Sequence, residues 1–141
     1  MAKKQSQKNA NRQWAAVAAV IVIAGGAWVW WSQFRQADET VAVTMPSLDA
    51  AQARGQAAFA NSCAICHGPN AGGTDAGPPL IHRIYEPSHH GDMSFVMAAQ
   101  RGVRQHHWKF GNMPAQPQVS EAEIADIIAY VRAVQRANGI D

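Results

Sequence analysis

The segment Cys63-Ala64-Ile65-Cys66-His67 contains both cysteines of this chain of 141 residues. Cysteines three positions apart lie about one helical turn from each other, and the histidine that follows can turn its ring toward the same ligand. A C-x-x-C-H run is typical of c-type haem attachment, in which two thioether bonds hold the porphyrin and an imidazole binds its iron. The motif therefore predicts one haem c, covalently bound to Cys63 and Cys66, with His67 as an axial iron ligand.

Other uses of the cysteine pair are disfavoured by the rest of the sequence. A thioredoxin-like redox pair lies near a β-α-β pattern, whereas no β-type alternation of useful length occurs in this chain. A zinc site would need further thiols, and a structural disulfide would leave the adjacent histidine without a role. Covalent haem attachment is therefore the interpretation that we keep.

An uninterrupted apolar segment of 18 residues runs from Trp14 to Trp31. At about 1.5 Å per residue, a helix of this length covers about 27 Å, close to the roughly 30 Å of hydrocarbon in a bilayer. The four basic residues before it predict, by the positive-inside rule, that the N-terminus stays in the cytoplasm. They are Lys3, Lys4, Lys8 and Arg12. We therefore expect a basic cytoplasmic tail over residues 1–13 and a transmembrane helix over residues 14–34.

A cleaved signal peptide is the competing interpretation of this segment, because Gly25-Gly26-Ala27 offers small residues to a peptidase. Hydrophobicity continues past that point to Trp31, which favours an uncleaved signal anchor in the inner (cytoplasmic) membrane. The polar residues 35–46 then form a short linker, and the domain that follows lies on the periplasmic side. A face of small residues in the span is suited to a transmembrane helix partner as well as to the lipid bilayer. Its members are Ala15, Ala18, Ala19, Val22 and Gly26.

The basic character of the chain belongs to its N-terminal tail. From Leu48 onward, seven Lys or Arg face eight Asp or Glu, so the remainder is nearly neutral. Nucleic-acid binding would require a basic face on the folded domain. We therefore expect no nucleic-acid partner.

The first of three helices expected in the all-α domain at residues 47–141 contains an unusual glycine. Ser47 or Asp49 is suited to cap this helix, which runs through Ala60. Gly55 lies in its interior, where glycine costs about 1 kcal/mol relative to alanine. A close helix crossing would explain that glycine.

The other two helices have clear boundary residues. The second runs from Asp92, as the N-cap, to Arg101 and is ended by Gly102. The third begins after Ser120, which forms a capping box with Glu123, and carries one apolar stripe. The stripe consists of Ile124, Ile127, Ile128, Val131 and Val134, and the helix ends near Asn138-Gly139. Three helices with long loops make a thin core, to which a buried haem would add apolar surface.

Met113 is the best candidate for the second axial ligand of the iron. It lies in a loop before Pro114, and a following proline biases a residue toward an extended conformation. Met93 and Met97 fall at helical spacing on the second helix, where methionine is commonly core filler. Bis-histidine ligation stays open as an alternative, because several imidazoles lie in loops. The candidates are His82, His89, His90, His106 and His107.

The pairs His89-His90 and His106-His107 also allow a second metal site. Imidazole binds both copper and zinc, and such a site requires the two pairs to converge in space. Without convergence, we expect these side chains to be solvated or to lie near the haem propionates.

Over most of Ser47 to Gly139, the chain resembles the class I c-type cytochromes, which are mono-haem and His/Met-ligated. The matching residues are Gly55-x-x-x-Phe59, Cys63-x-x-Cys66-His67, Gly77-Pro78-Pro79-Leu80, Trp108, Met113-Pro114 and Tyr130. The resemblance implies the small cytochrome c fold, with three or more helices wrapped around one covalently bound haem.

The resemblance also implies roles for residues around the haem. Gly55 would let the first helix cross the last near Tyr130. The carbonyl of Pro78 would accept the Nδ1 proton of His67 and so orient the imidazole. Trp108 would pack at the haem edge and donate its indole N–H to a propionate, with simple core packing as the alternative.

An iron bound by both His67 and Met113 has no open position for a substrate, so it can accept and return one electron and do little else. We therefore expect an electron-transfer protein rather than an enzyme: a membrane-anchored carrier between respiratory or photosynthetic membrane complexes. The main alternative is a permanent haem c subunit of a larger membrane oxidase or dehydrogenase. A haem sensor or peroxidase-like enzyme would require Met113 to be absent from the iron. A copper-handling protein would use the histidine pairs.

Overall fold

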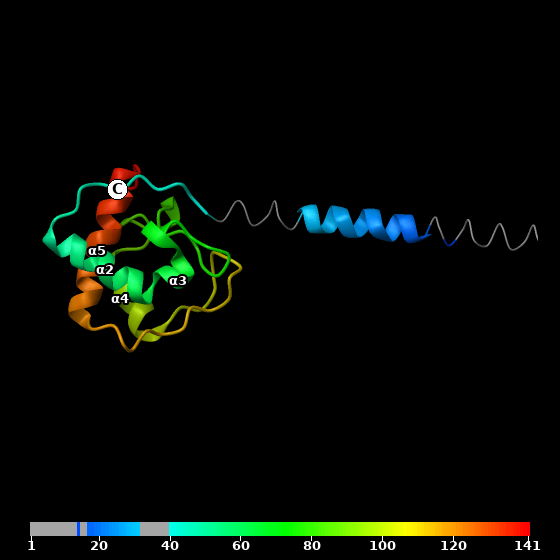
Figure 1. Ribbon diagram of the computed structural model, residues 1–141. Helices are drawn as coiled ribbons and strands as arrows, with labels where there is room; N and C mark the ends of the chain where they lie inside the picture. The colour runs from blue at the N-terminus through cyan, green and yellow to red at the C-terminus, as the bar shows by residue number, and fades with distance from the viewer. Residues whose placement is uncertain (1–13, 15–16, 32–39) are drawn as a thin grey trace, which may run out of the picture. The chain divides into compact units, whose positions relative to one another are not determined.

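The computed structural model describes Trp14, residues 17–31 and residues 40–141. The chain divides into two compact units, Met1–Asp38 and Glu39–Asp141. The described residues of the first unit are helical (Figure 1). Within the described ranges, no helix has both the length and the apolarity that a bilayer crossing needs. The predicted tail at residues 1–13 and parts of the predicted span at residues 14–34 lie outside these ranges.

The second unit is helical, so the prediction of an all-α domain is confirmed. Its elements are α2 (Ala50–Ser62), α3 (Ala64–His67), the 3-10 helices η1 (Pro69–Ala71) and η2 (Arg83–Tyr85), α4 (Asp92–Arg101) and α5 (Glu121–Ala137). Figure 1 shows α2 and α5 crossing each other, with α3 and α4 on the side where the long loops run. The buried core lies between these helices and includes Phe59, Leu80, Ile127 and Val131.

Helix α2 begins after Asp49 because this residue forms a capping box with Gln52. The Asp49 carboxylate accepts from the Gln52 backbone N–H at 2.9 Å, and the Gln52 side chain accepts from the Asp49 N–H at 3.0 Å. These bonds satisfy two N–H groups that a helix start leaves without partners. Asp49, rather than Ser47, is therefore the cap, and the helix extends two residues beyond the expected end at Ala60.

The crossing of α2 over α5 depends on the absence of a side chain at Gly55. A Cβ atom built there would lie 1.9 Å from the backbone oxygen of Asp126 and 2.9 Å from the Cβ of Tyr130. One turn later, the rings of Phe59 and Tyr130 pack with centroids 5.6 Å apart. Arg54 adds an ion pair to Asp126 at 2.8 Å. The expectation that Gly55 permits a close crossing near Tyr130 is thus confirmed.

Helix α5 has the predicted cap and the predicted apolar stripe. The Ser120 hydroxyl accepts from the Glu123 N–H at 3.3 Å, and the Glu123 carboxylate accepts from the Ser120 N–H at 2.8 Å. Two polar residues lie on the buried side of the helix: Arg132, which is 7% exposed, and Gln135, which is 0% exposed. The helix therefore brings polar anchors as well as apolar surface into the core.

Helix α4 differs from its prediction in its cap and in its methionines. Gly91 is the N-cap, and Asp92 lies in the first turn because its carboxylate instead accepts from the Nε of Arg132 at 2.8 Å. Gly102, with φ +74°, ends the helix as predicted. Met93 and Met97 are 68% and 36% exposed, so the interpretation as core filler was wrong. The inward face of α4 is instead supplied by Phe95, Ala98 and Ala99.

Residues 40–46, predicted as part of a linker over residues 35–46, pack on the helical domain. The backbone N–H and C=O of Thr44 both bond the side chain of Asn138, at 2.9 and 2.8 Å. Alternate residues of an extended segment point to the same side, and here that side is apolar and faces the core. These residues are Val41, Val43 and Met45. The domain thus begins before the expected boundary, and residues 35–39 lie outside the described ranges.

Candidate haem site

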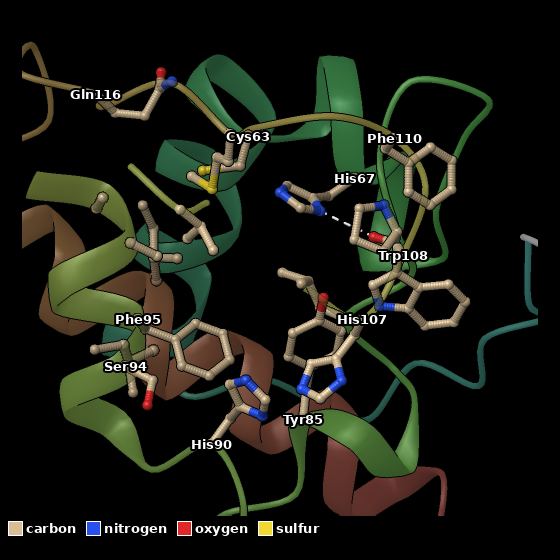
Figure 2. A pocket seen from close by; sticks show the side chains of 18 of the residues that line it. Cys63, His67, Tyr85, His90, Ser94, Phe95, His107, Trp108, Phe110 and Gln116 are labelled. Carbon is tan, nitrogen blue, oxygen red and sulfur yellow. Dashed lines mark hydrogen bonds between the residues drawn. The ribbon is translucent and has the colours of Figure 1, made fainter. Parts of the chain in front are cut away.

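A largely apolar pocket lies between α2, α4, α5 and the loop after α4. Its empty space is about 1110 Å³, part of which is open to solvent. Phe59, Phe95 and Ile128 supply its apolar walls. Figure 2 shows the labelled side chains of Cys63, His67 and Phe95 around the same space.

The attachment motif lies at the junction of α2 and α3. Cys63 joins the two helices: its N–H donates to the carbonyl of Phe59 at 2.8 Å, and its own carbonyl accepts from the N–H of His67 at 2.9 Å. Cys63 and His67 line the pocket, whereas Cys66 is half-buried and is not among the lining residues. The turn of helix predicted for this segment therefore places one cysteine and the histidine directly at the pocket.

The electrostatics of the motif disfavour a thiol redox pair. Burial, and then the neighbouring Cys66, raise the pKa of the Cys63 thiol to about 11. Reactive cysteines of redox motifs have pKa values lowered to about 3.5–7.5, because the thiolate is the nucleophile. A thiol with a raised pKa is poorly suited to disulfide exchange.

His67 is oriented by the loop that follows α3. Its Nδ1 lies 2.9 Å from the carbonyl oxygen of Pro78, which can only accept, so Nδ1 carries the proton and Nε2 keeps the lone pair (Figure 2). Burial lowers the pKa of His67, and the bond to Pro78 opposes that shift. A neutral imidazole with a free Nε2 is the form that binds iron. The hydrogen bond implied by the family resemblance is present.

Met113 lines the same pocket as His67 on a loop that is held by its backbone. Met113 and Val103 form an isolated antiparallel bridge with N–H to carbonyl distances of 2.9 and 3.0 Å. Gly102 permits this approach, because a Cβ atom there would lie 2.5 Å from the Met113 oxygen. This arrangement brings the thioether residue and His67 to one cavity. Met93, Met97 and His82 are not among its lining residues.

Trp108 carries an unpaired polar atom at this pocket. Its indole nitrogen is buried and has no hydrogen-bond partner, which costs about 1–3 kcal/mol for a buried donor. The hydroxyl of Tyr85 lies nearby (Figure 2), and burial raises its pKa while the indole opposes the shift. The two groups are neighbours, but no hydrogen bond joins them. A hydrogen-bond acceptor is therefore what this corner lacks, and a haem propionate would supply one.

Arg132 and Gln135 bond the backbone of the segment 80–90, which lines part of the pocket, and the sequence did not lead us to either residue. Arg132 donates from Nη1 to the carbonyl of Tyr85 at 2.7 Å and from Nη2 to the carbonyl of His90, and its guanidinium lies 4.8 Å from the centre of the Phe95 ring. Gln135 donates to the carbonyl of Leu80 at 2.9 Å. The signal was available, because both residues follow the apolar stripe of α5 at helical spacing.

The two predicted histidine pairs converge beside the haem pocket. His90, His106 and His107 line it, and His89 lies 3.3 Å from His107 between their Nε2 atoms. Burial, and then the other three imidazoles, lower the pKa of His107. Convergence, which the sequence left open, is thus a feature of the fold.

The features of the pocket fit a covalently bound haem: an apolar cavity, a C-x-x-C-H turn at its edge, an oriented imidazole and a buried donor without an acceptor. A family model for cytochrome c matches residues 52–135. No curated protein and no solved structure matches the chain. Cys63 and Cys66 fit the C-x-x-C-H attachment of a covalently bound haem c, and this chain belongs to the cytochrome c family.

Proposed function

We propose that this protein is a membrane-anchored one-electron carrier on the periplasmic side, with His67 and Met113 as the axial ligands of its haem c. Membership of the cytochrome c family indicates electron transfer as the general role. The observation that carries the finer proposal is the position of Met113, whose bridged loop lines the same cavity as His67. Such a carrier would pass electrons between respiratory or photosynthetic membrane complexes.

When bound, the haem supplies a reversible ferric/ferrous couple. His67 would present Nε2 to the iron, because the Pro78 carbonyl holds its Nδ1 proton. The thioether of Met113 is a neutral, soft donor that favours the ferrous state and raises the potential. The apolar walls would keep water away from the porphyrin, and the Trp108 indole would donate to a propionate.

Occupation of both axial positions by side chains is the reason for proposing a carrier and not an enzyme. A substrate, oxygen or peroxide needs an open coordination position on the iron. The haem edge would then serve as the docking surface, in the small and weak contacts that are typical of redox encounters.

The membrane anchor is supported by the composition of the N-terminal helical segment. Its described large apolar side chains are strongly exposed within this chain, including Ile21 at 66%, Val22 at 74% and Trp28 at 68%. Apolar side chains so exposed to water would be covered by the hydrocarbon of a bilayer, and the basic residues that precede this segment in the sequence are typical of a membrane span. Carbonate extraction of membranes should leave the full chain in the pellet, whereas a chain lacking residues 1–39 should be released. Release of the full chain would contradict the anchor.

The packing of residues 40–46 also favours the second candidate, a permanent haem subunit of a larger membrane oxidase or dehydrogenase. If the span ends at residue 34, five residues separate it from residue 40, and five residues reach at most about 18 Å. So short a tether restricts the haem domain to partners at the membrane surface. Size-exclusion chromatography after mild detergent extraction separates the two roles, because a free carrier elutes alone and a subunit elutes with its complex.

Replacement of Met113 by leucine tests the ligand assignment. The substitution nearly conserves volume and removes the sulfur, so the midpoint potential should fall and the ferrous protein should bind carbon monoxide rapidly. Met45→Leu is the matched control, since Met45 packs against the core from the N-terminal segment. An unchanged midpoint potential in Met113→Leu would indicate that a nearby imidazole, and not Met113, is the second axial ligand.

A further inference from the structure

The four histidines beside the haem pocket come from two loops that are distant in sequence. His89 and His90 follow η2, and His106 and His107 follow α4. The ring centroids of His89 and His107 are 5.3 Å apart, those of His90 and His107 are 5.2 Å apart, and those of His106 and His107 are 4.4 Å apart. Four neutral or positively charged rings gathered in this way have no carboxylate in their hydrogen bonds. Their proximity therefore calls for an explanation other than ion pairing.

The ring nitrogens of three of these histidines are arranged as ligands. One nitrogen from each of His89, His90 and His107 lies within 4.8 Å of the others. The Nε2 atoms of His89 and His107 are 3.3 Å apart. Two imidazole nitrogens bound tetrahedrally to one ion at about 2.0–2.1 Å lie about 3.3 Å from each other. The pair is thus already at the separation that a shared ion imposes.

His90 is held in the orientation that is common for a metal ligand. Its Nδ1 lies 2.7 Å from the carbonyl oxygen of Ile84, which can only accept a proton. The lone pair is therefore on Nε2, as in metal sites where a backbone carbonyl fixes the tautomer of the ligating imidazole. Arg132 anchors the same loop by donating to the carbonyl of His90, so the loop does not need the metal for its position.

We propose that His89, His90 and His107 bind a copper ion at the rim of the haem pocket. Imidazole nitrogen is a ligand for several divalent ions of the first transition row, and among these Cu(II) binds a given nitrogen site most tightly. A hydrogen bond between His89 and His107 would use one nitrogen of each ring and would not involve Nε2 of His90. An ion satisfies all three.

Two exposed thioethers favour copper over zinc. A second hollow adjoins the haem pocket and is lined by His90, Met93, Met97 and His106. Met93 and Met97 are one turn apart on the outer face of α4, where apolar side chains gain little from burial. Soft thioether ligands select Cu(I), and zinc does not require them. The thioethers of Met93 and Met97 would thus offer ligands to Cu(I), beside the imidazoles that would bind Cu(II).

Metal binding to the full-length, haem-loaded protein, purified in detergent without an affinity tag, tests the proposal. Equilibrium dialysis against Cu(II), followed by metal analysis, should find one copper per chain in addition to the haem iron. The electron paramagnetic resonance spectrum should show splitting from several imidazole nitrogens. Less than one copper per chain after dialysis, or a spectrum without nitrogen splitting, would refute the proposed site. The haem potential is measured separately, so this outcome is distinct from failure of the proposed electron-carrier function.

The double variant His89→Ala, His107→Ala should weaken Cu(II) binding by more than about 100-fold, since loss of an outer-sphere partner alone costs 10–100-fold. His89 is exposed and does not line the haem pocket, so the single variant His89→Ala should leave the haem spectrum unchanged and report correct folding. His82→Asn is the control, because an amide oxygen at this cap position can still accept from the N–H of Ile84. Equal copper affinity in the double variant and the control would refute the assignment.

The thioethers are tested by Met93→Leu, Met97→Leu, with Cu(I) measured against a competing chelator. Affinity for Cu(I) should fall at least about tenfold, while Cu(II) binding should persist through the imidazoles. Preferential retention of Zn(II) over Cu(II) by the native protein would overturn the choice of metal. Unchanged Cu(I) affinity in the methionine variant would refute the role of the thioethers.

Discussion

Replacement of Gly55 by alanine tests the claim that the α2–α5 crossing is set by the absence of one side chain. The new Cβ would lie 1.9 Å from the Asp126 oxygen and 2.4 Å from its carbonyl carbon, while real Cβ contacts essentially never fall below 3.0 Å. The two helices must therefore separate locally by about 1 Å. Because the obstacle is backbone and not a flexible side chain, rotamer changes cannot relieve it.

The expected loss follows from three contributions to the free energy of unfolding. Overpacking costs about 1–3 kcal/mol. A loosened Phe59–Tyr130 ring pair removes up to about 1 kcal/mol more. Alanine recovers about 1 kcal/mol through its higher helix propensity. These contributions sum to a net destabilisation between about 0 and 3 kcal/mol, and the clash with backbone atoms places Gly55→Ala in the upper half of that range. The free energy is measured by urea denaturation of the haem-loaded protein, followed through the haem absorbance.

A matched control separates steric clash from a general effect of the glycine-to-alanine change. Gly91 has negative φ, and a Cβ there would meet only the Pro87 oxygen, at the ordinary distance of 3.5 Å. Gly91→Ala should therefore cost no more than about 1 kcal/mol, the typical effect of weakening an N-cap. If Gly55→Ala were as stable as the parent protein or more stable, the close crossing would be refuted as the reason for this glycine.

Three further predictions concern the loops and caps. Gly102→Ala forces an alanine to φ +74° and places its Cβ 2.5 Å from the Met113 oxygen. The substitution should lower the free energy of unfolding by about 1–3 kcal/mol and increase carbon monoxide binding to the ferrous haem. Values like those of the parent protein in both assays would contradict the role of Gly102 in the bridge between Val103 and Met113. Arg132→Met should lower the free energy of unfolding, measured in urea, by about 2–4 kcal/mol, because it leaves buried carbonyls with fewer donors. Arg132→Lys should not restore this stability. Bonds from Ser120 lower the pKa of Glu123, so the stabilisation by this cap is present above its ordinary value of 4.5 and is lost as pH falls through the lowered folded value. Glu123→Gln, which can still accept from the Ser120 N–H, should flatten that acid dependence of stability, and an unchanged slope would exclude this carboxylate as its source.

The caps and the attachment turn could be predicted because their determinants lie within one helical turn. Ser120 and Glu123 are three residues apart, as are Cys63 and Cys66, so the spacing alone states which groups meet. The second helix shows the limit of this reasoning. Asp92 has the side chain of a good cap, but a residue 40 positions away takes its carboxylate, and glycine occupies the cap position instead.

Met93 and Met97 were wrongly predicted to lie in the core, for a related physical reason. Helical spacing states that two residues share a face, but it does not state whether that face meets the core. The pocket lies on the side of Phe95, so the methionines are exposed on the other side. The linker error at residues 40–46 is similar, because the apolar alternation of Val41 and Val43 is short and gains meaning only from the core against which it packs.

The sequence by itself determined the cofactor, the motif suited to attach it and the helices around it, since each depends on a short motif or on a local pattern of caps and apolar residues. Tertiary structure alone decided which distant groups meet. It brought His89 and His90 to His107, placed Arg132 beneath their loop, and brought Met113 to the cavity of His67. Such contacts join residues far apart along the chain, so they are set by how helices cross and loops close, which no local pattern encodes.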